Sequence, residues 1–189
     1  MEKSNIQPWK TLSSSTALDE RWFTVRRDTV QLPLGKVVDD YFVWESPHIA
    51  MVVPMTSEGD LVIVRQYRHA VGQILHQFPA GAVDKDETVE AAARREMREE
   101  SGYQTTERLQ HLGTIAPYST KITGVTDIYL APNATQTSTP EYDEQEETEV
   151  LTMSPENVLE LCTNGELQQA DFISAAYLAL NALIKRAYS

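Results

Sequence analysis

Residues 81–103, GAVDKDETVEAAARREMREESGY, give the strongest indication of how this chain folds. From Asp86 to Glu100 it is rich in Ala, Glu, Arg and Met and contains neither Gly nor Pro, which predicts a helix. Gly102 stands where a residue in the left-handed conformation would end that helix. We therefore expect one well-defined helix in this segment.

The predicted helix carries two stripes of side chains along its length. The apolar stripe, which would face the core, consists of Val89, Ala93 and Met97. The acidic stripe has glutamates at positions i, i+3 and i+4, namely Glu96, Glu99 and Glu100. Three anions this close repel one another, and a divalent cation with a preference for oxygen ligands would turn that repulsion into binding. The acidic stripe therefore indicates a candidate metal site.

The alternative for the acidic stripe is a solvated helix face on which the glutamates pair with Arg94, Arg95 and Arg98. A longer pattern favours metal binding. It runs Gly81, five residues, Glu87, seven residues, Arg95, Glu96, Met97, one residue, Glu99, Glu100, one residue, Gly102, Tyr103. Seven fixed letters would coincide by chance with a probability on the order of 10⁻⁸ per start site. The segment resembles the complete Nudix box.

This resemblance implies an α/β fold, namely an α/β/α sandwich with a mixed sheet, and the hydrolysis of a nucleoside diphosphate linked to another group. It also implies the metal ligands. Glu96 and Glu100 would be inner ligands together with the backbone carbonyl of Ala80, and Glu99 would bind a further ion or support one. Mg²⁺ is the expected ion, with Mn²⁺ as the alternative.

The remaining fixed residues of the box have structural roles by the same resemblance. Glu87 and Arg95 correspond to the internal ion pair that fixes the loop to the helix. Gly81 corresponds to the residue that permits a sharp entry to the motif, and Gly102 to the residue that ends the helix.

Beyond the box, nearly the whole chain is similar to the ADP-ribose and nucleoside-diphosphate-sugar pyrophosphatase branch of the family. The similarity is found in Trp9–Ser13, Arg65–Arg68 and Phe78–Gly81, and in Pro117, fifteen residues after Gly102. It implies that Pro117 and either Arg65 or Arg68 contact the substrate, because guanidinium groups beside the box suit a diphosphate. The alternative for both arginines is a surface position at a strand end.

Two departures from the branch concern the substrate. Gln77 stands where the branch usually has Glu, and residues 118–125 lack its usual Pro-Gly-x-Ser/Thr pattern. We expect ADP-ribose, cleaved to AMP and ribose 5-phosphate, with GDP-mannose or a broad range of nucleotide sugars as the alternative. Dinucleoside polyphosphates or nucleoside triphosphates are a further alternative, and a nucleotide-sugar sensor without catalysis represents a different class of protein.

An acidic run, Glu141 to Glu147, contains five carboxylates in seven residues. Considered alone it indicates a solvated loop. The branch usually takes its catalytic base or an extra metal ligand from a glutamate late in the chain, which here would be Glu144 or Glu146. Glu99 is the third candidate for a direct role in catalysis.

The amino-terminal residues predict a β-hairpin, because the runs Trp22–Leu32 and Val37–Trp44 flank Pro33, Leu34, Gly35 and Lys36. We expect residues 1–45 to form an amino-terminal β element and residues 46–189 the hydrolase domain. In the branch this element exchanges between subunits and contacts the nucleoside base. The resemblance thus implies a homodimer with Trp22, and Arg26 or Arg27, near the partner's cleft. The alternative is a hairpin that caps its own subunit.

Further elements follow from periodicity and capping. Strands are expected at Ile49–Met55, Leu61–Tyr67, Leu112–Ile115, Thr126–Ala131 and Thr148–Met153. Ser154 and Pro155 should open a helix that Asn164 and Gly165 close. A last helix should begin near Asp171 and present one apolar face, made of Ile173, Tyr177, Leu180 and Ile184.

Composition limits the classes of partner. The chain has 189 residues, a net charge of −12 and 41% hydrophobic residues, which fits one globular domain. The negative charge argues against nucleic acid or an anionic membrane as a partner. No apolar run reaches secretory or membrane-spanning length, so we expect a cytoplasmic protein. The single cysteine, Cys162, lies in an apolar stretch and is expected to be a buried hydrophobe.

Overall fold

The computed structural model describes residues 6–21, 23–141 and 148–187. The chain divides into two units, residues 1–47 with 118–124, and residues 48–117 with 125–189. Among the described residues, no helix has the length and the apolar character that crossing a membrane requires.

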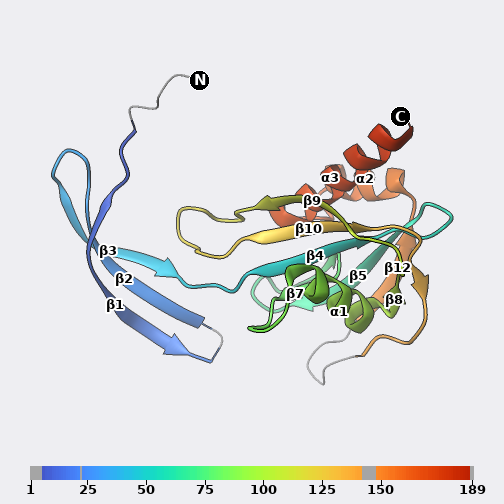
Figure 1. Ribbon diagram of the computed structural model, residues 1–189, viewed down its shortest axis with the longest axis horizontal. Helices are drawn as coiled ribbons and strands as arrows, with labels where there is room; N and C mark the ends of the chain where they lie inside the picture. Colours follow the sequence, from blue (N-terminus) through green and yellow to red (C-terminus); the bar gives the residue numbers. More distant parts are fainter. Residues whose placement is uncertain (1–5, 22, 142–147, 188–189) are drawn as a thin grey trace. The chain divides into compact units, whose positions relative to one another are not determined.

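The first unit is a three-stranded antiparallel sheet in the order β1-β2-β3 (Figure 1). Its strands are β1 (Lys10–Glu20), β2 (Phe23–Gln31) and β3 (Val37–Trp44). The predicted hairpin is confirmed, since β2 pairs with β3 across the expected turn. Strand β1 was not predicted, and the reason is physical. Every residue of β1 is exposed, so the strand has no buried face to leave an apolar alternation in the sequence.

Residues 118–124 belong to the same unit because they pair with the end of β3. The Trp44 amide donates to the Lys121 carbonyl at 2.8 Å, and the Thr123 amide donates to the Trp44 carbonyl at 3.1 Å. The Tyr41 hydroxyl donates to the Thr120 carbonyl at 2.6 Å, and Lys121 Nζ lies 3.9 Å from the centre of the Tyr41 ring. The segment is thus fixed to β3 by both backbone and side chain.

The second unit contains two larger sheets and one short strand pair. The first sheet has the order β7-β4-β10-β9, with β4 and β10 parallel and the outer pairs antiparallel. The second sheet is antiparallel in the order β12-β5-β6, and β11 pairs with β8. The bounds are β4 Ile49–Pro54, β5 Leu61–Arg68, β6 Gln73–Gln77, β7 Ala80–Ala82, β8 Tyr103–Gln104, β9 Gln110–Ile115, β10 Thr126–Ala131, β11 Thr135–Gln136 and β12 Thr148–Met153.

Strand β4 is buried on both faces, and its alternation assigns the helices to two layers. Ala50 and Val52 pack in the cluster that contains helix α1 (Val89–Ser101). Met51 and Val53 pack in the cluster that contains α2 (Pro155–Asn164) and α3 (Ala170–Ala187). Helix α1 therefore lies on one side of the strands and α2 and α3 on the other, as Figure 1 shows. The α/β/α sandwich with a mixed sheet is confirmed.

Helix α1 begins later than predicted, at Val89, because Thr88 caps it. The Thr88 side chain accepts a hydrogen bond from the Ala91 amide at 3.2 Å. Gly102 ends the helix with φ 71°, and its amide donates to the Arg98 carbonyl at 2.8 Å, as expected. The predicted apolar stripe is also confirmed, with Met97 fully buried in the core.

The predicted apolar face of α3 was only partly right, since Ile173 packs against the core but two of the other predicted residues do not. Tyr177 and Ile184 are 48% and 57% exposed, whereas the buried residues of the helix are mainly small ones: Phe172, Ala175, Ala176, Ala179 and Ala182. Alanines allow the helix axis to approach the sheet closely, and their modest hydrophobicity makes such a face harder to recognise than one of larger side chains. Of the larger side chains, Ile173, Leu178 and Leu183 pack partly buried against the core, whereas Tyr177 and Ile184 are exposed.

Candidate active site

Gly81 and Glu96 share one small space between β7 and α1. A Cβ atom added to Gly81 would lie 2.1 Å from Glu96 Oε1 and 2.3 Å from its Cδ. Gly81 is not among the glycines with positive φ, so its backbone would also suit other residues. What the glycine provides is room for a carboxylate, and the Glu96 side chain is only 12% exposed as a result.

Glu100 lies against the same short strand. Its Oε2 accepts a hydrogen bond from the Ala80 amide at 3.0 Å. Helical spacing places Glu96 and Glu100 one turn apart on α1, and β7 receives both carboxylates at adjacent residues. The structure thus brings together Glu96, Glu100 and Ala80, the three residues expected to provide inner metal ligands. All three would provide oxygen ligands, which is the donor chemistry that Mg²⁺ prefers.

Arg95 is the central cation of the cluster. Its Nε and Nη2 contact the two carboxylate oxygens of Glu87 at 3.2 and 3.0 Å, and Nη2 also donates to the Ala82 carbonyl at 2.9 Å. Its Nη1 lies 2.5 Å from Glu96 Oε1 and 3.2 Å from Glu99 Oε2. One guanidinium therefore ties the loop before α1 to two carboxylates of the helix.

The pKa values of these groups follow from the same contacts. The hydrogen bond from Arg95 lowers the pKa of Glu87. Burial raises the pKa of Glu96, although the hydrogen bond and the charge of Arg95 oppose that rise. Burial thus makes the charged form of Glu96 costly unless a cation is beside it.

Glu99 faces the arginines of its own helix. Its Oε1 accepts from Arg98 Nη2 at 2.7 Å, and Arg95 contacts the other oxygen. In the described part of the chain, no three His, Cys, Asp or Glu side chains converge in an arrangement that could hold a metal ion. In this structure Glu99 pairs with Arg95 and Arg98, whereas Arg94 pairs elsewhere, with Glu90.

The two arginines expected near a phosphate lie on opposite faces of β5. Leu61 and Ile63 pack towards α2 and α3, and alternation along the strand places Arg65 on that face, where it contacts Glu149 at 3.3 Å. By the same alternation, Arg68 lies on the other face of β5. Its Nε and Nη2 donate to Gln77 Oε1 at 2.9 and 2.8 Å.

The other expected site residues lie in the first unit, in a turn or outside the described residues. Arg26 is paired with two carboxylates, Asp28 at 2.9 Å and Glu45 at 2.7 Å, whereas Arg27 donates through Nε to a backbone carbonyl. Pro117 is an exposed turn residue after β9. Trp22, Glu144 and Glu146 lie outside the described residues.

Two polar clusters were not predicted from the sequence. Gln66 and Gln77 are buried next to Arg68, and Gln77 Nε2 donates to Gln66 Oε1 at 2.9 Å. The positions of both residues on paired strands were the only signal that could have suggested this contact.

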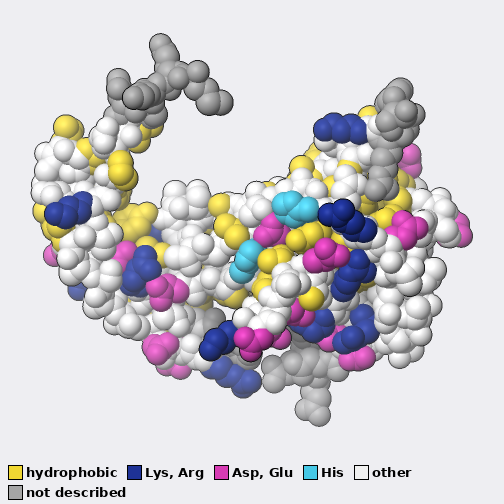
Figure 2. Space-filling view, viewed as in Figure 1, with side chains coloured by type: hydrophobic (Ala, Val, Ile, Leu, Met, Phe, Trp, Pro, Cys, Tyr) yellow, Lys and Arg dark blue, Asp and Glu magenta, His cyan; other side chains and the backbone are white. Residues whose placement is uncertain are grey.

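The second cluster joins two histidines through one carboxylate. Asp127 Oδ2 lies 2.6 Å from His48 Nε2, Oδ1 lies 2.6 Å from His111 Nε2, and Thr114 also donates to Oδ1. Figure 2 shows histidine side chains with an acidic side chain between them on this face. Burial would raise the pKa of Asp127, but hydrogen bonds from Thr114, His111 and His48 lower it overall.

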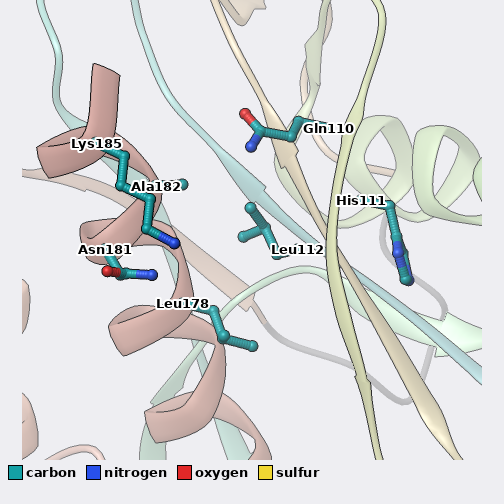
Figure 3. A pocket seen from close by; sticks show the side chains of 7 residues that line it. All are labelled: Gln110, His111, Leu112, Leu178, Asn181, Ala182 and Lys185. Atoms are coloured by element: carbon teal, nitrogen blue, oxygen red, sulfur yellow. The ribbon is translucent and has the colours of Figure 1, made fainter. Parts of the chain in front are cut away.

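A hollow of about 370 Å³ lies between β9 and α3 (Figure 3). Leu112, Leu178 and Ala182 point into it, and Asn181 and Lys185 stand on the same helix. Because α3 covers the opposite side of the strands from α1, this hollow is separate from the carboxylate cluster.

Comparison with known proteins gives the family. Residues 46–176 match the model of the NUDIX domain, and residues 9–44 match that of the nucleoside diphosphate sugar hydrolase N-terminal domain. The chain therefore belongs to the NUDIX family and is a Nudix hydrolase. Members of this family generally use divalent metal ions.

Individual relatives define the similarity further. The chain is 35% identical to an ADP-ribose pyrophosphatase of Mycobacterium tuberculosis, over 73% of this chain and 66% of that protein. It is 27% identical to an ADP-ribose pyrophosphatase of Bacillus subtilis, over 85% and 86% of the two chains. A crystal structure of an ADP compounds hydrolase superimposes with a TM-score of 0.86, at 22% identity over 97% and 98% of the chains, and so shares the fold.

Proposed function

We propose that this protein hydrolyses the pyrophosphate bond of a nucleoside diphosphate sugar in a Mg²⁺-dependent reaction, and that ADP-ribose is the preferred substrate. The products would be AMP and ribose 5-phosphate. The observation that supports this most is the arrangement of the Glu96 and Glu100 carboxylates against Gly81 and Ala80. The names of the two pyrophosphatase relatives support ADP-ribose as the substrate. GDP-mannose is the alternative substrate, because Gln77 stands where the branch usually has Glu.

In this proposal Glu96, Glu100 and the carbonyl of Ala80 hold Mg²⁺ or Mn²⁺, and Glu99 supports a further ion. When bound, Mg²⁺ would stabilise negative charge on the phosphate oxygens and lower the pKa of a bound water. Arg95 keeps Glu96 and Glu87 in place on either side of the entry to α1.

The base that removes a proton from the attacking water would be a glutamate, because a carboxylate near metal-bound water suits that task. Glu99 is the candidate within the described residues, once its contacts with Arg95 and Arg98 are released. Glu144 and Glu146, outside the described residues, are the other candidates. The Glu99 carbonyl accepts a hydrogen bond from the Glu141 amide at 2.8 Å, so the first residue of the acidic run lies beside α1.

Arg68 is the better candidate of the two arginines for binding a phosphate. It lies on the face of β5 opposite Arg65, and its hydrogen-bond partner, Gln77, is neutral. Arg65 lies on the opposite face and its charge is compensated by Glu149. We therefore propose Arg68 as the main contact with the substrate phosphates. Arg65 and Pro117 are the further contacts that the family resemblance implies.

The decisive experiment measures AMP release from ADP-ribose with and without Mg²⁺. Glu100→Gln should lower turnover by more than about a hundredfold, because it removes a charged metal ligand. Glu90→Gln is the matched control, since it makes the same change on α1 at a residue that pairs only with Arg94 among the contacts seen. Near-normal turnover in Glu100→Gln would refute the assignment.

The same samples distinguish the alternatives for substrate and class. GDP-mannose, ADP-glucose and diadenosine polyphosphates should be turned over more slowly than ADP-ribose. Saturable binding of ADP-ribose without any product over hours would instead indicate a sensing module.

We further propose a homodimer formed through the first unit. Its buried apolar side chains in the described residues are Val30 and Val43, while Trp9 and Phe42 are 51% and 44% exposed. A small sheet with so little buried surface is marginal by itself. A second copy would cover these side chains and bring Arg27, and Trp22 from outside the described residues, to the partner's nucleotide.

Sedimentation tests the dimer directly. The protein should sediment at twice the 21.3 kDa of one chain, and Phe42→Asp should shift it towards the monomer. A fully active monomer at all concentrations would contradict this proposal.

A further inference from the structure

Arg68 is held by a chain of two buried amides. Its Nε and Nη2 both donate to Gln77 Oε1, and Gln77 Nε2 donates to Gln66 Oε1 at 2.9 Å. Gln77 is 1% exposed and Gln66 is 4% exposed. A buried amide without partners costs free energy, so this connected arrangement stabilises one orientation of each side chain.

The chain of amides also fixes which atom of Gln77 faces the arginine. If the Gln77 amide rotated by half a turn, its NH₂ group would face the guanidinium, and two donors would meet. Its carbonyl oxygen would likewise face Gln66 Oε1, and two acceptors would meet. Arg68 and Gln66 therefore both favour the orientation in which the Gln77 oxygen faces Arg68.

The charge of Arg68 remains uncompensated by this partner, because an amide oxygen is a neutral acceptor. A carboxylate at the same position would hold the guanidinium equally well and cancel its charge. Asp171 also interacts electrostatically with Arg68: burial raises the pKa of Asp171, and the charge of Arg68 acts to lower it. The guanidinium also has N–H groups that Gln77 does not use.

We propose that Gln77, fixed by Gln66, is a positioning residue that directs Arg68 and preserves its positive charge for the diphosphate of the substrate. This inference rests on the proposed function for the identity of the ligand. The contacts themselves do not depend on it. Binding of a diphosphate group can therefore be tested without turnover.

The principal variant is Gln77→Glu, which keeps an acceptor beside Arg68 but adds a negative charge. The Kd for ADP, a probe whose diphosphate carries no second sugar, should rise about tenfold by titration calorimetry. KM for ADP-ribose should rise in parallel while kcat changes little, because Arg68 binds and does not react. The dependence of Kd on ionic strength should also become weaker.

The matched control is Gln168→Glu. Gln168 is exposed in the connection between α2 and α3, so it receives the same charge in solvent. Its Kd for ADP should equal that of the wild type. An equal rise in both variants would show a general effect of net charge and would overturn the proposal.

A second variant keeps the test valid if Gln77→Glu does not fold. Gln66→Met removes the acceptor that orients the Gln77 amide and leaves the charge of the chain unchanged. It should also weaken ADP binding, by a smaller factor, with kcat near that of the wild type. Unchanged ADP binding in a folded Gln66→Met protein would mean that the orientation of Gln77 has no role.

The outcomes separate this inference from the proposed function. A wild-type protein that binds ADP but releases no AMP from any nucleotide sugar would refute the function alone. Equal ADP affinity in wild type and Gln77→Glu, or no ADP binding by the wild type, would refute the role of Gln77 whatever the turnover.

Discussion

The substitution Gly81→Ala tests whether the position of the Glu96 carboxylate matters for metal binding. The added methyl would lie 2.1 Å from Glu96 Oε1, and ordinary contact begins near 3.4 Å, so the oxygen must move by about 1.3 Å. The atoms that must move are the end of a side chain, and the Gly81 backbone has no positive φ. The protein should therefore fold with a thermal midpoint close to that of the wild type.

The expected effect on function is large despite the small change. A displacement of about 1 Å at a reacting centre can cost on the order of a hundredfold in rate, and a disturbed ligand typically lowers metal affinity about 10- to 100-fold. Mn²⁺ binding followed by electron paramagnetic resonance gives the affinity without turnover. AMP release as a function of Mg²⁺ concentration gives the kinetic effect.

A double-mutant cycle with Glu96→Asp sharpens this test. The shorter aspartate withdraws from the space that the methyl needs, so the two substitutions should not be additive. A folded Gly81→Ala protein with wild-type Mn²⁺ affinity and wild-type turnover would refute the reasoning. A large loss of stability would also contradict it, because the strain would then fall on the backbone.

Three further substitutions test the surrounding structure by urea denaturation. Gly102→Ala should cost about 1–3 kcal/mol, because φ is 71° and the new Cβ would lie 2.1 Å from a backbone carbonyl oxygen. Met97→Ala should cost about 2–5 kcal/mol through the cavity it leaves. Asp127→Asn should cost about 1–3 kcal/mol at pH 7, since His48 and His111 lose a charged acceptor. Because the folded-state pKa of Asp127 is lowered, this cost should be constant above about pH 4 and should shrink as the pH falls below that value. An Asp127→Asn protein whose deficit is unchanged at pH 3 would contradict this assignment.

Several parts of the fold could be predicted because independent signals agreed. For α1, helix propensity, the apolar stripe and the glycine after it all indicate the same helix. Strand β1 gave no such signal, since its stability comes from backbone pairing with β2 and not from burial. The buried face of α3 was partly misassigned for a related reason, because alanines contribute close packing more than hydrophobicity.

In the candidate site, too, some residues could be predicted from the sequence and others could not. The glutamates of α1 could be recognised from their spacing, whereas the role of Gly81 depends on how closely β7 approaches α1. That distance is set by the packing of both elements on β4 and has no local signature. The separation of Arg65 from Arg68 does follow from the alternation of a strand, once the neighbouring Ile63 is known to face α2 and α3.

The contacts of Arg95 connect the structure seen here with the proposed metal site. Glu96 is largely buried, and a buried carboxylate needs a cation beside it. Arg95 satisfies this need from within the chain, and it reaches Glu99 with the same nitrogen. A divalent ion at Glu96 would compete for the same oxygens. The measured metal affinity would therefore report the difference in binding free energy between the metal ion and Arg95 at the Glu96 carboxylate. After the metal displaced Arg95 from Glu96, the contacts with Glu87 and the Ala82 carbonyl would still hold the guanidinium nearby.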